Sequence, residues 1–395
     1  MKNCISMTLM LGLLAPLATA DSVSTVDARV LTGSVVSLDA KVLTLSQPGK
    51  KTETVPLGKL LSVEWAPVKK LAAERLLCKT FSGCEIPFSN LSIRDNRIAL
   101  TTQAVPAPLR ARALNEVATL VFPKLMQTAE EVLGRCATRG YATGPKDLLV
   151  IEREDGKYQS AAGVLLGITA INVQFRFNDK DRTVARTKVR ALFLSRTIAP
   201  IAPAKLHVTT TGGATLACRT IAIAKTVTCT LAGGTTHTLT AASLASAAWV
   251  SDSVAFVSSL KPTKTTEHGL LDVVFPHRLN RSVAGGPIRL GGKTYTNGLG
   301  LHSFCELDYD LVGGYSQFLA TVGIDDSTKG RGDAQLTILA DGKPLKTMRV
   351  KGGAKPVALR LALTGVKRLT IRVGFGEDKL GVGDHVNLAN ARLVK

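Results

Sequence analysis

The chain has 395 residues, which is enough for two or three domains. Its 45% apolar residues exclude a disordered or collagen-like chain, because this much apolar surface buries itself in a core. The net charge of +20 does not indicate nucleic-acid binding, since Lys and Arg are spread along the chain and few aromatic residues flank them. Attraction to an anionic envelope or an acidic polysaccharide is one explanation of this charge, and simple solubility is the other.

The first twenty residues have the pattern of a secretory signal peptide. Lys2 precedes an apolar stretch over 5–14, and Ala-Thr-Ala at 18–20 forms an A-x-A cleavage site before Asp21. We expect cleavage there, the alternative being an uncleaved N-terminal anchor. No later apolar run reaches the roughly 20 residues that a membrane span needs. The protein is therefore predicted to be exported to the periplasm, the cell surface or the medium, with no membrane span after processing.

Six cysteines remain in the processed chain, and an exported location permits them to form disulfides. They are Cys78, Cys84, Cys136, Cys218, Cys229 and Cys305. Cys218 and Cys229 flank an expected hairpin, and Cys78 and Cys84 are close enough to close a short loop. Six cysteines allow fifteen pairings, and the sequence does not choose among them.

A β-strand pattern recurs four times between the signal peptide and residue 250. Each copy has short runs of alternating apolar residues with turns every 8 to 12 residues, which predicts four or five antiparallel strands. This is the size of a small SH3-like or Sm-like barrel, and repeats of about 50 residues indicate an array of similar units. The copies span 26–65, 75–122, 148–195 and 204–250.

Trp65 and Trp249 close the first and last copies at the same place. We expect both to fill the end of a core, and an exposed ligand platform is the alternative. Between the second and third copies, Thr128–Thr138 predicts a helix with Thr128 as its N-cap and Glu131 as the capping-box partner. Residues 199–203, Ala-Pro-Ile-Ala-Pro, predict a stiff connector.

The domain plan that follows has five parts. It comprises a signal peptide at 1–20, two small β-barrel repeats at 21–123, a helical connector at 124–147, two further small barrels at 148–252, and a separate module at 253–395. Nothing in 21–252 carries recognisable chemistry. These repeats are therefore predicted to be spacers or surfaces for protein partners.

From about Val254 the sequence becomes rich in glycine, and strand patterns alternate with polar turns. Strands are predicted at 318–324, 334–339, 357–363 and 369–373, with a hairpin turn at Asp341-Gly342. Gly298 and Gly300 are expected where the backbone needs close approach or a positive φ. About 140 residues of this kind predict a jelly-roll β-sandwich, so the whole chain is expected to be mostly β.

Four segments of this region, in order, resemble the NPCBM family. They are Asn280–Ser303, Tyr315–Asp326, Ala340–Leu345 and Gly383–Val394. NPCBM modules are carbohydrate-binding modules attached to glycoside hydrolase family 98 and to many exported proteins. The resemblance covers about 255–394 and implies a galactose-binding-like jelly roll that binds sugar without cleaving it.

One position departs from the family pattern. Family members commonly carry Asp-His-x-x-Trp near the end, whereas here Asp384 and His385 are followed by Leu388. If the family Trp stacks on sugar, this chain binds weakly or serves only as a structural module. If it fills the core, Leu is a tolerable replacement.

Sugars are bound by planar hydrogen-bonding side chains together with a surface for the apolar side of the ring. The candidate carbohydrate-binding residues are Asp325, Asp326, Asp384, His385, Asn387 and, behind them, His302. Each has a structural alternative: the aspartates cap turns, and the histidines are hydrogen-bonded within the fold. Asp325 and Asp326 are also candidates for a structural Ca²⁺ site, and no other cofactor is expected.

The predicted function is that of an exported, non-catalytic, multi-module protein whose C-terminal module binds carbohydrate or polysaccharide. A glycosidase needs two carboxylates about 5 to 10 Å apart in a cleft, and no region beside the repeats is large enough for such a domain. A G-x-S-x-G nucleophile elbow is also missing from the sequence. Two alternatives remain: an envelope scaffold whose jelly roll has lost sugar binding, and an accessory module of glycoside hydrolysis.

Overall fold

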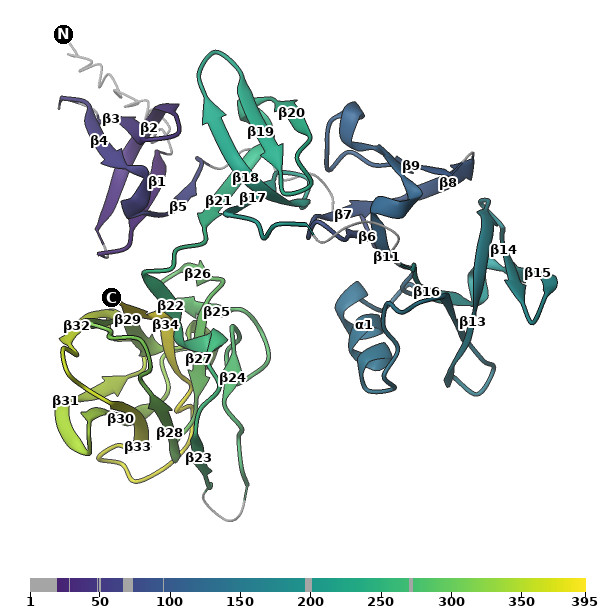
Figure 1. Cartoon of the computed structure of the whole chain (residues 1–395). Helices are drawn as coiled ribbons and strands as arrows, with labels where there is room; N and C mark the ends of the chain where they lie inside the picture. Colours follow the sequence, from purple (N-terminus) through teal and green to yellow (C-terminus); the bar gives the residue numbers. More distant parts are fainter. Residues whose placement is uncertain are drawn as a thin grey trace, which may run out of the picture. The chain divides into compact units, whose positions relative to one another are not determined.

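The computed structural model describes residues 20–395 except 28, 48, 50, 67–73, 95, 196–200 and 270–272. The chain forms two compact units, one built mainly by Val30–Trp249 and the other mainly by Val250–Lys395. Strands are the main secondary structure of both, as predicted (Figure 1). No helix among the described residues is long and apolar enough to cross a membrane. The predicted signal peptide and the first part of the 199–203 connector lie outside the described residues.

The first unit contains the same strand order four times, each time with a short 3-10 helix directly before the last strand. The first copy comprises β1 (Asp21–Thr25), β2 (Val30–Leu38), β3 (Val42–Ser46), β4 (Glu53–Pro56), η1 (Leu57–Lys59) and β5 (Leu60–Glu64). The third comprises β12 (Asp147–Glu152), β13 (Tyr158–Ile168), β14 (Asn172–Phe177), β15 (Lys180–Ala185), η4 (Arg186–Lys188) and β16 (Val189–Phe193). The fourth comprises β17 (Leu206–Thr210), β18 (Thr215–Ile223), β19 (Val227–Leu231), β20 (Thr236–Leu239), η5 (Ala241–Ser243) and β21 (Leu244–Trp249).

The second copy differs because its second strand is interrupted at Ser89 and a longer loop precedes its fourth strand. It comprises β6 (Leu76–Thr80), β7 (Glu85–Phe88), β8 (Asn90–Arg94), β9 (Arg97–Thr101), η2 (Ala107–Leu109), β10 (Ala111–Ala113), η3 (Leu114–Glu116) and β11 (Val117–Val121). In every copy the first strand pairs antiparallel with both the second and the fifth. This closes each copy into a small five-stranded unit, while its SH3-like or Sm-like kinship stays a prediction.

Alternating apolar residues of these strands form the core of the unit. Leu43 and Leu45 on β3 are completely buried, and the residues between and after them face outward. Trp65 and Trp249 are partly buried and pack against the same core. Their packing favours the core-filling role that the sequence suggested over an exposed platform.

The copies are joined in pairs through their last strands. β5 pairs antiparallel with β21, which joins the first copy to the fourth, and β11 pairs with β16, which joins the second to the third. The two junctions have the same register, because in each the last residue of one strand lies opposite the third residue of the other. These pairs are Glu64 with Ser246 and Val121 with Ala191. The first unit is therefore a pair of pairs.

The helix α1 (Ala129–Ala137) covers only one of these junctions, and the sequence explains why. Val121 and Phe193 give the β11–β16 junction an apolar face, which packs against Val132 and Cys136 of α1. The matching positions of the β5–β21 junction hold Glu64 and Ala248, which are exposed. Neither position carries a large apolar side chain that needs burial, so only the β11–β16 junction requires a helix.

The predicted helix start is confirmed. Thr128 Oγ1 accepts a hydrogen bond from Glu131 N at 3.2 Å, and Glu131 Oε2 accepts one from Thr128 N at 2.8 Å. The two residues thus form a complete capping box.

Replacing Thr128 by alanine is expected to lower the free energy of unfolding by about 1 kcal/mol, because one helix N–H loses its acceptor. The midpoint of urea unfolding measures the change. Thr52→Ala, at an exposed position outside any strand, is the control and should change stability by less than about 0.5 kcal/mol. Equal effects of the two substitutions would contradict the capping role.

All six cysteines among the described residues are buried and carry free thiols in this structure. The pairings that the sequence left open are therefore not formed. Burial raises the pKa of Cys78 to about 12 and that of Cys136 to about 11. Both groups are protonated, unreactive thiols at neutral pH.

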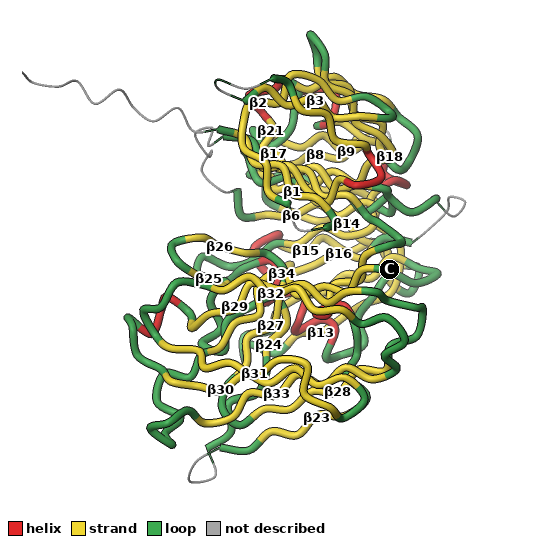
Figure 2. Tube along the Cα trace, turned by 90° about the vertical axis from the view of Figure 1, so that its left-hand side faces the viewer, coloured by secondary structure: helices red, strands yellow, loops and turns green. Residues whose placement is uncertain are grey.

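The second unit is a jelly-roll β-sandwich of two antiparallel sheets. One sheet has the order β24-β27-β34-β29-β32, with β22 paired to β34, and the other has the order β23-β28-β33-β30-β31. Figure 2 shows the two sheets as stacked layers. Their bounds are β22 (Val254–Phe256), β23 (Lys264–Glu267), β24 (Arg278–Leu279), β27 (Gly298–Leu301), β28 (Cys305–Asp310), β29 (Gln317–Ile324), β30 (Asp333–Ala340), β31 (Lys343–Lys351), β32 (Val357–Ala362), β33 (Arg368–Phe375) and β34 (Val386–Val394).

Several local predictions for this unit are confirmed. The four predicted strands correspond to β29, β30, β32 and β33, and Asp341-Gly342 forms the two-residue turn between β30 and β31, with φ of 47° and 80°. Gly298 has a φ of +150°. A Cβ on Gly300 would lie 2.3 Å from the carbonyl oxygen of Arg281, so only glycine fits there.

Candidate functional site

The six candidate residues lie at one end of the sandwich, which is where β27 and β29 end and where β34 begins. His302 follows β27, Asp325 and Asp326 follow β29, and the other three lie at the start of β34. The fold therefore brings together residues that are separated by more than eighty positions. Their environments differ, because some are in the core and others reach the surface.

Asp384 is completely buried and connects two loops. Its Oδ2 accepts a hydrogen bond from Ser303 Oγ at 2.5 Å, and its Oδ1 accepts one from Asp333 N at 2.8 Å. Burial raises the pKa of this carboxyl above its usual value, although the two hydrogen bonds oppose the rise. The contacts give Asp384 a structural role at the base of this end.

Asp325 is also buried and accepts hydrogen bonds from three residues. They come from Ser327 N at 3.0 Å, Arg289 N at 3.0 Å and Asn387 Nδ2 at 2.6 Å. Burial acts to raise the pKa of this carboxyl, but the hydrogen bonds outweigh it and hold the pKa below its usual value. Asn387 is itself fully buried.

Asp326 is exposed, yet its carboxylate is engaged by the loop of a neighbouring hairpin. This hairpin consists of β25 (Ile288–Leu290) and β26 (Lys293–Tyr295). Gly291 N and Gly292 N donate to the two carboxylate oxygens at 2.9 and 2.8 Å. Asp325 and Asp326 thus both accept hydrogen bonds from backbone N–H groups, and the structural Ca²⁺ site suggested for them stays a prediction. Among the described residues, no three His, Cys, Asp or Glu side chains are placed to hold a metal.

The two histidines and one phenylalanine form a ring cluster that reaches the surface. His302 is buried, and its ring centroid lies 4.4 Å from that of Phe275 and 5.7 Å from that of His385. His385 is half-buried, and within the described chain its Nδ1 has no hydrogen-bond partner. Burial lowers the pKa of His385, so its imidazole is neutral at pH 7.

Phe275 is 44% exposed at this end of the sandwich. A second stack lies beside it along the chain, where the exposed His268 ring is 4.4 Å from the ring of Phe304 at an interplanar angle of 8°. We call Phe275, His302, His385, His268 and Phe304 the rim surface. The sequence analysis missed both phenylalanines and His268. The signal available was Val273-Val274-Phe275, three apolar residues in succession outside the strand pattern.

The position of Leu388 shows whether the residue in place of the family Trp faces the core or the surface. It is completely buried in the sandwich core, opposite Leu299 on β27 and Val322 on β29. A side chain at this position packs between the sheets. In this chain the leucine is therefore the core-filling replacement, and it does not reach a ligand at the surface.

Two hollows occur elsewhere in the described part of the chain. One, of about 720 Å³, lies on the sheet that contains β28 and β33, and the other, of about 530 Å³, lies beside α1. None of the six candidate residues lines either hollow. The candidate site is therefore distinct from these two hollows, and its role in binding sugar stays a prediction.

Comparison with known proteins supports the resemblance found in the sequence. Residues 253–394 match the model of the NPCBM/NEW2 domain. A Renibacterium salmoninarum protein named as an endo-alpha-N-acetylgalactosaminidase is 40% identical over 92 residues, which is 23% of this chain. The match spans 6% of that protein's length.

Two of the similar solved structures are carbohydrate-binding modules. The CBM51 module of Clostridium perfringens GH95 in complex with methyl-galactose is 22% identical, with a TM-score of 0.32, over 36% of this chain and 99% of that one. The tandem CBM51 modules of a family 98 glycoside hydrolase from Streptococcus pneumoniae are 12% identical, with a TM-score of 0.31, over 94% of this chain and 87% of that one.

Proposed function

We propose that the protein is an exported, non-catalytic carbohydrate-binding protein and that its NPCBM/NEW2 domain, residues 253–394, holds saccharide on the rim surface. The observation that carries this proposal is the exposed ring of Phe275 beside two histidines, in a domain of a carbohydrate-binding family. An exposed aromatic ring offers an apolar surface to the C–H side of a sugar. A neutral imidazole both donates and accepts, which suits sugar hydroxyl groups.

On this proposal the aspartates support the site and do not touch the sugar. Asp325 and Asp384 hold the loops that carry His302 and His385, because Asp325 N donates to His385 O at 2.8 Å and Asp384 accepts from Ser303. Asn387 supports Asp325 in the same way. This arrangement also keeps the scaffold alternative open, since a network that only stabilises loops needs no ligand.

The first test is a glycan array probed with residues 21–395. The array should include N-acetylgalactosamine and galactose, because of the name of the Renibacterium relative, together with neutral and acidic polysaccharides. Phe275→Ala is expected to weaken the best interaction by about tenfold or more, which corresponds to about 1.4 kcal/mol and is in line with the loss of apolar contact. The matched control is Phe177→Ala on β14, where the side chain is 38% exposed, and it should leave binding unchanged.

If no glycan on the array is bound, the proposal is wrong and the envelope-scaffold function is favoured. Turnover of chromogenic glycosides by the full chain would instead favour a glycosidase. The array is repeated with EDTA, and binding is expected to stay the same because, among the described residues, no three His, Cys, Asp or Glu side chains are placed to hold a metal. A loss that added Ca²⁺ restores would contradict this assignment.

A further inference from the structure

A hollow of about 720 Å³ lies on the second sheet of the sandwich and extends along β28 and β33 to the turn between β30 and β31. It begins at Glu306, two residues after Phe304 of the rim surface, and ends at Asp310 and Asp341. None of the five rim-surface residues lines it. We call this hollow the sheet groove. It is a separate feature with its own chemistry.

The floor of the sheet groove is a ladder of acidic side chains on β28 facing basic and hydroxyl side chains on β33. The register places Glu306 opposite Arg372, Asp308 opposite Thr370, and Asp310 opposite Arg368. Arg372 Nε donates to the Glu306 carboxylate, Thr370 Oγ1 donates to Asp308 Oδ1 at 2.5 Å, and Arg368 Nε donates to Asp310 Oδ1 at 3.3 Å. Side chains two positions apart on a strand repeat every 7 Å or so, which gives the floor a regular spacing.

One wall of the groove is fixed by hydrogen bonds from backbone N–H groups to a carboxylate. Asp341, in the β30–β31 turn, accepts hydrogen bonds from Lys367 N at 3.1 Å and Arg368 N at 2.8 Å. The turn is therefore held against the start of β33. Val312, which is 86% exposed, adds an apolar edge. The groove is thus shaped before any ligand arrives, which lowers the entropy cost of binding.

We propose that the sheet groove is a second binding site and that its ligand is a neutral oligosaccharide chain. Acidic and basic groups nearly balance along its lining, so neither a polyanion nor a polycation finds a complementary field. Each paired carboxylate keeps free lone pairs and each guanidinium keeps free N–H groups. Sugar hydroxyls both donate and accept, so they can use both kinds of group. A volume of about 720 Å³ is within the range of small-molecule sites and exceeds a single sugar ring.

The test is isothermal titration of the full chain with neutral oligosaccharides of one to six units from the polysaccharide class that binds best on the array. Asp308→Asn and Thr370→Val alter the floor while keeping side-chain size, and Arg368→Gln changes an exposed group. Each is expected to weaken the binding of chains of three or more units at least fivefold and to leave monosaccharide binding unchanged. Thr347→Val, on β31 outside the groove, is the control, and a thermal melt of each variant checks folding.

The outcomes separate this site from the rim surface. In the Phe275→Ala background, long chains should still bind and the groove variants should remove that binding. Three results would overturn the groove proposal without affecting the rim site. They are an affinity that does not depend on chain length, stronger binding of polygalacturonate than of neutral chains, and full affinity in all three groove variants. A loss in the groove variants alone, with Phe275→Ala unchanged, would overturn the rim site instead.

Discussion

Replacing Glu152 by alanine is expected to lower the free energy of unfolding of the first unit by about 3–5 kcal/mol. The Glu152 side chain is only 6% exposed, and its Oε2 lies 2.7 Å from Arg190 Nε and 2.7 Å from Lys124 Nζ. Arg190 is buried to the same degree, and its Nη1 donates to the carbonyl oxygens of Thr187 and Val189. Without the carboxylate, the guanidinium is left as an uncompensated charge in the core.

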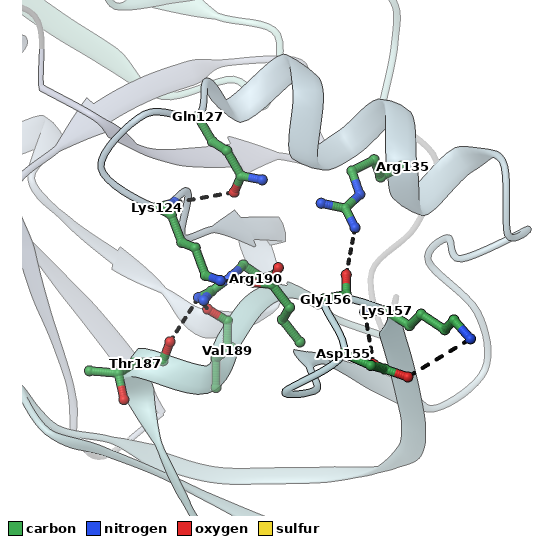
Figure 3. A network of polar contacts seen from close by, with 10 residues as sticks. Lys124, Gln127, Arg135, Asp155, Gly156, Lys157, Thr187, Val189 and Arg190 are labelled. Carbon is green, nitrogen blue, oxygen red and sulfur yellow. Dashed lines mark hydrogen bonds and ion pairs between the residues drawn. The ribbon is translucent and has the colours of Figure 1, made fainter.

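Figure 3 shows the polar contacts around Lys124 and Arg190, at the junction of the second and third copies. The Lys124 and Arg190 side chains converge there, and Arg135 of α1 donates to the carbonyl oxygen of Gly156 at 2.7 Å nearby. Lys124 comes from the segment after β11, and Arg190 comes from β16. The Glu152 carboxylate therefore holds together strands and connector from two copies.

The effect should depend on pH in a defined direction. Burial acts to raise the pKa of Glu152, but hydrogen bonds from Lys124 and Arg190 outweigh it and hold the pKa below its usual value. A depressed pKa gives stabilisation that is complete above the unfolded value of about 4.3 and is lost as the pH falls through the folded value. The difference between wild type and variant, measured by urea unfolding, should therefore shrink below about pH 4.

Asp181→Ala is the control for this prediction. It breaks the ion pair between Arg176 and Asp181, in which both side chains are about half exposed, and it should cost less than about 1 kcal/mol. An equal loss in the two variants, or a Glu152→Ala loss that stays constant down to pH 2, would contradict the buried-pair account.

Replacing Asp325 by alanine is expected to destabilise the second unit by about 3–5 kcal/mol, because four donor groups lose their acceptor. These groups are Ser327 N, Ser327 Oγ, Arg289 N and Asn387 Nδ2. Asp326→Ala is the matched control, since its exposed carboxylate makes hydrogen bonds at the surface and should cost about 1 kcal/mol. Thermal unfolding of the two variants gives the comparison.

The same variant separates a supporting role from direct ligand contact. At temperatures where the Asp325→Ala protein remains folded, its glycan affinity should be reduced but not abolished. The reduction is expected because the loss of Asp325 disturbs the position of His385. An Asp325→Ala protein with unchanged stability and no glycan binding would show that Asp325 contacts the sugar, which the structure does not support.

Local features could be predicted from the sequence because short-range chemistry decides them. The capping box of α1 depends on Thr128 and Glu131 alone, and the β30–β31 turn depends on Asp341 and Gly342. The strand pattern also appears directly where burial alternates, as it does along β3, β9 and β17. The pairing of first with fourth and second with third copy is different, because it joins strands separated by many residues.

The candidate site was harder to predict for a physical reason. Asp325 follows β29, whereas Asp384 precedes β34 and Asn387 is its second residue. Polar residues at strand ends are equally compatible with an exposed loop and with a buried hydrogen-bond network. Only their burial in the folded unit distinguishes the two. Phe275 escaped notice for the opposite reason, since an apolar residue in a loop carries no pattern that marks it as exposed.

A crystal structure of the full chain with the glycan that binds best on the array tests the central claim most directly. The account predicts a sugar ring lying over the exposed side of Phe275, with hydroxyl groups directed to His385. Glycan bound only within residues 21–249, with both the rim surface and the sheet groove empty, would contradict it.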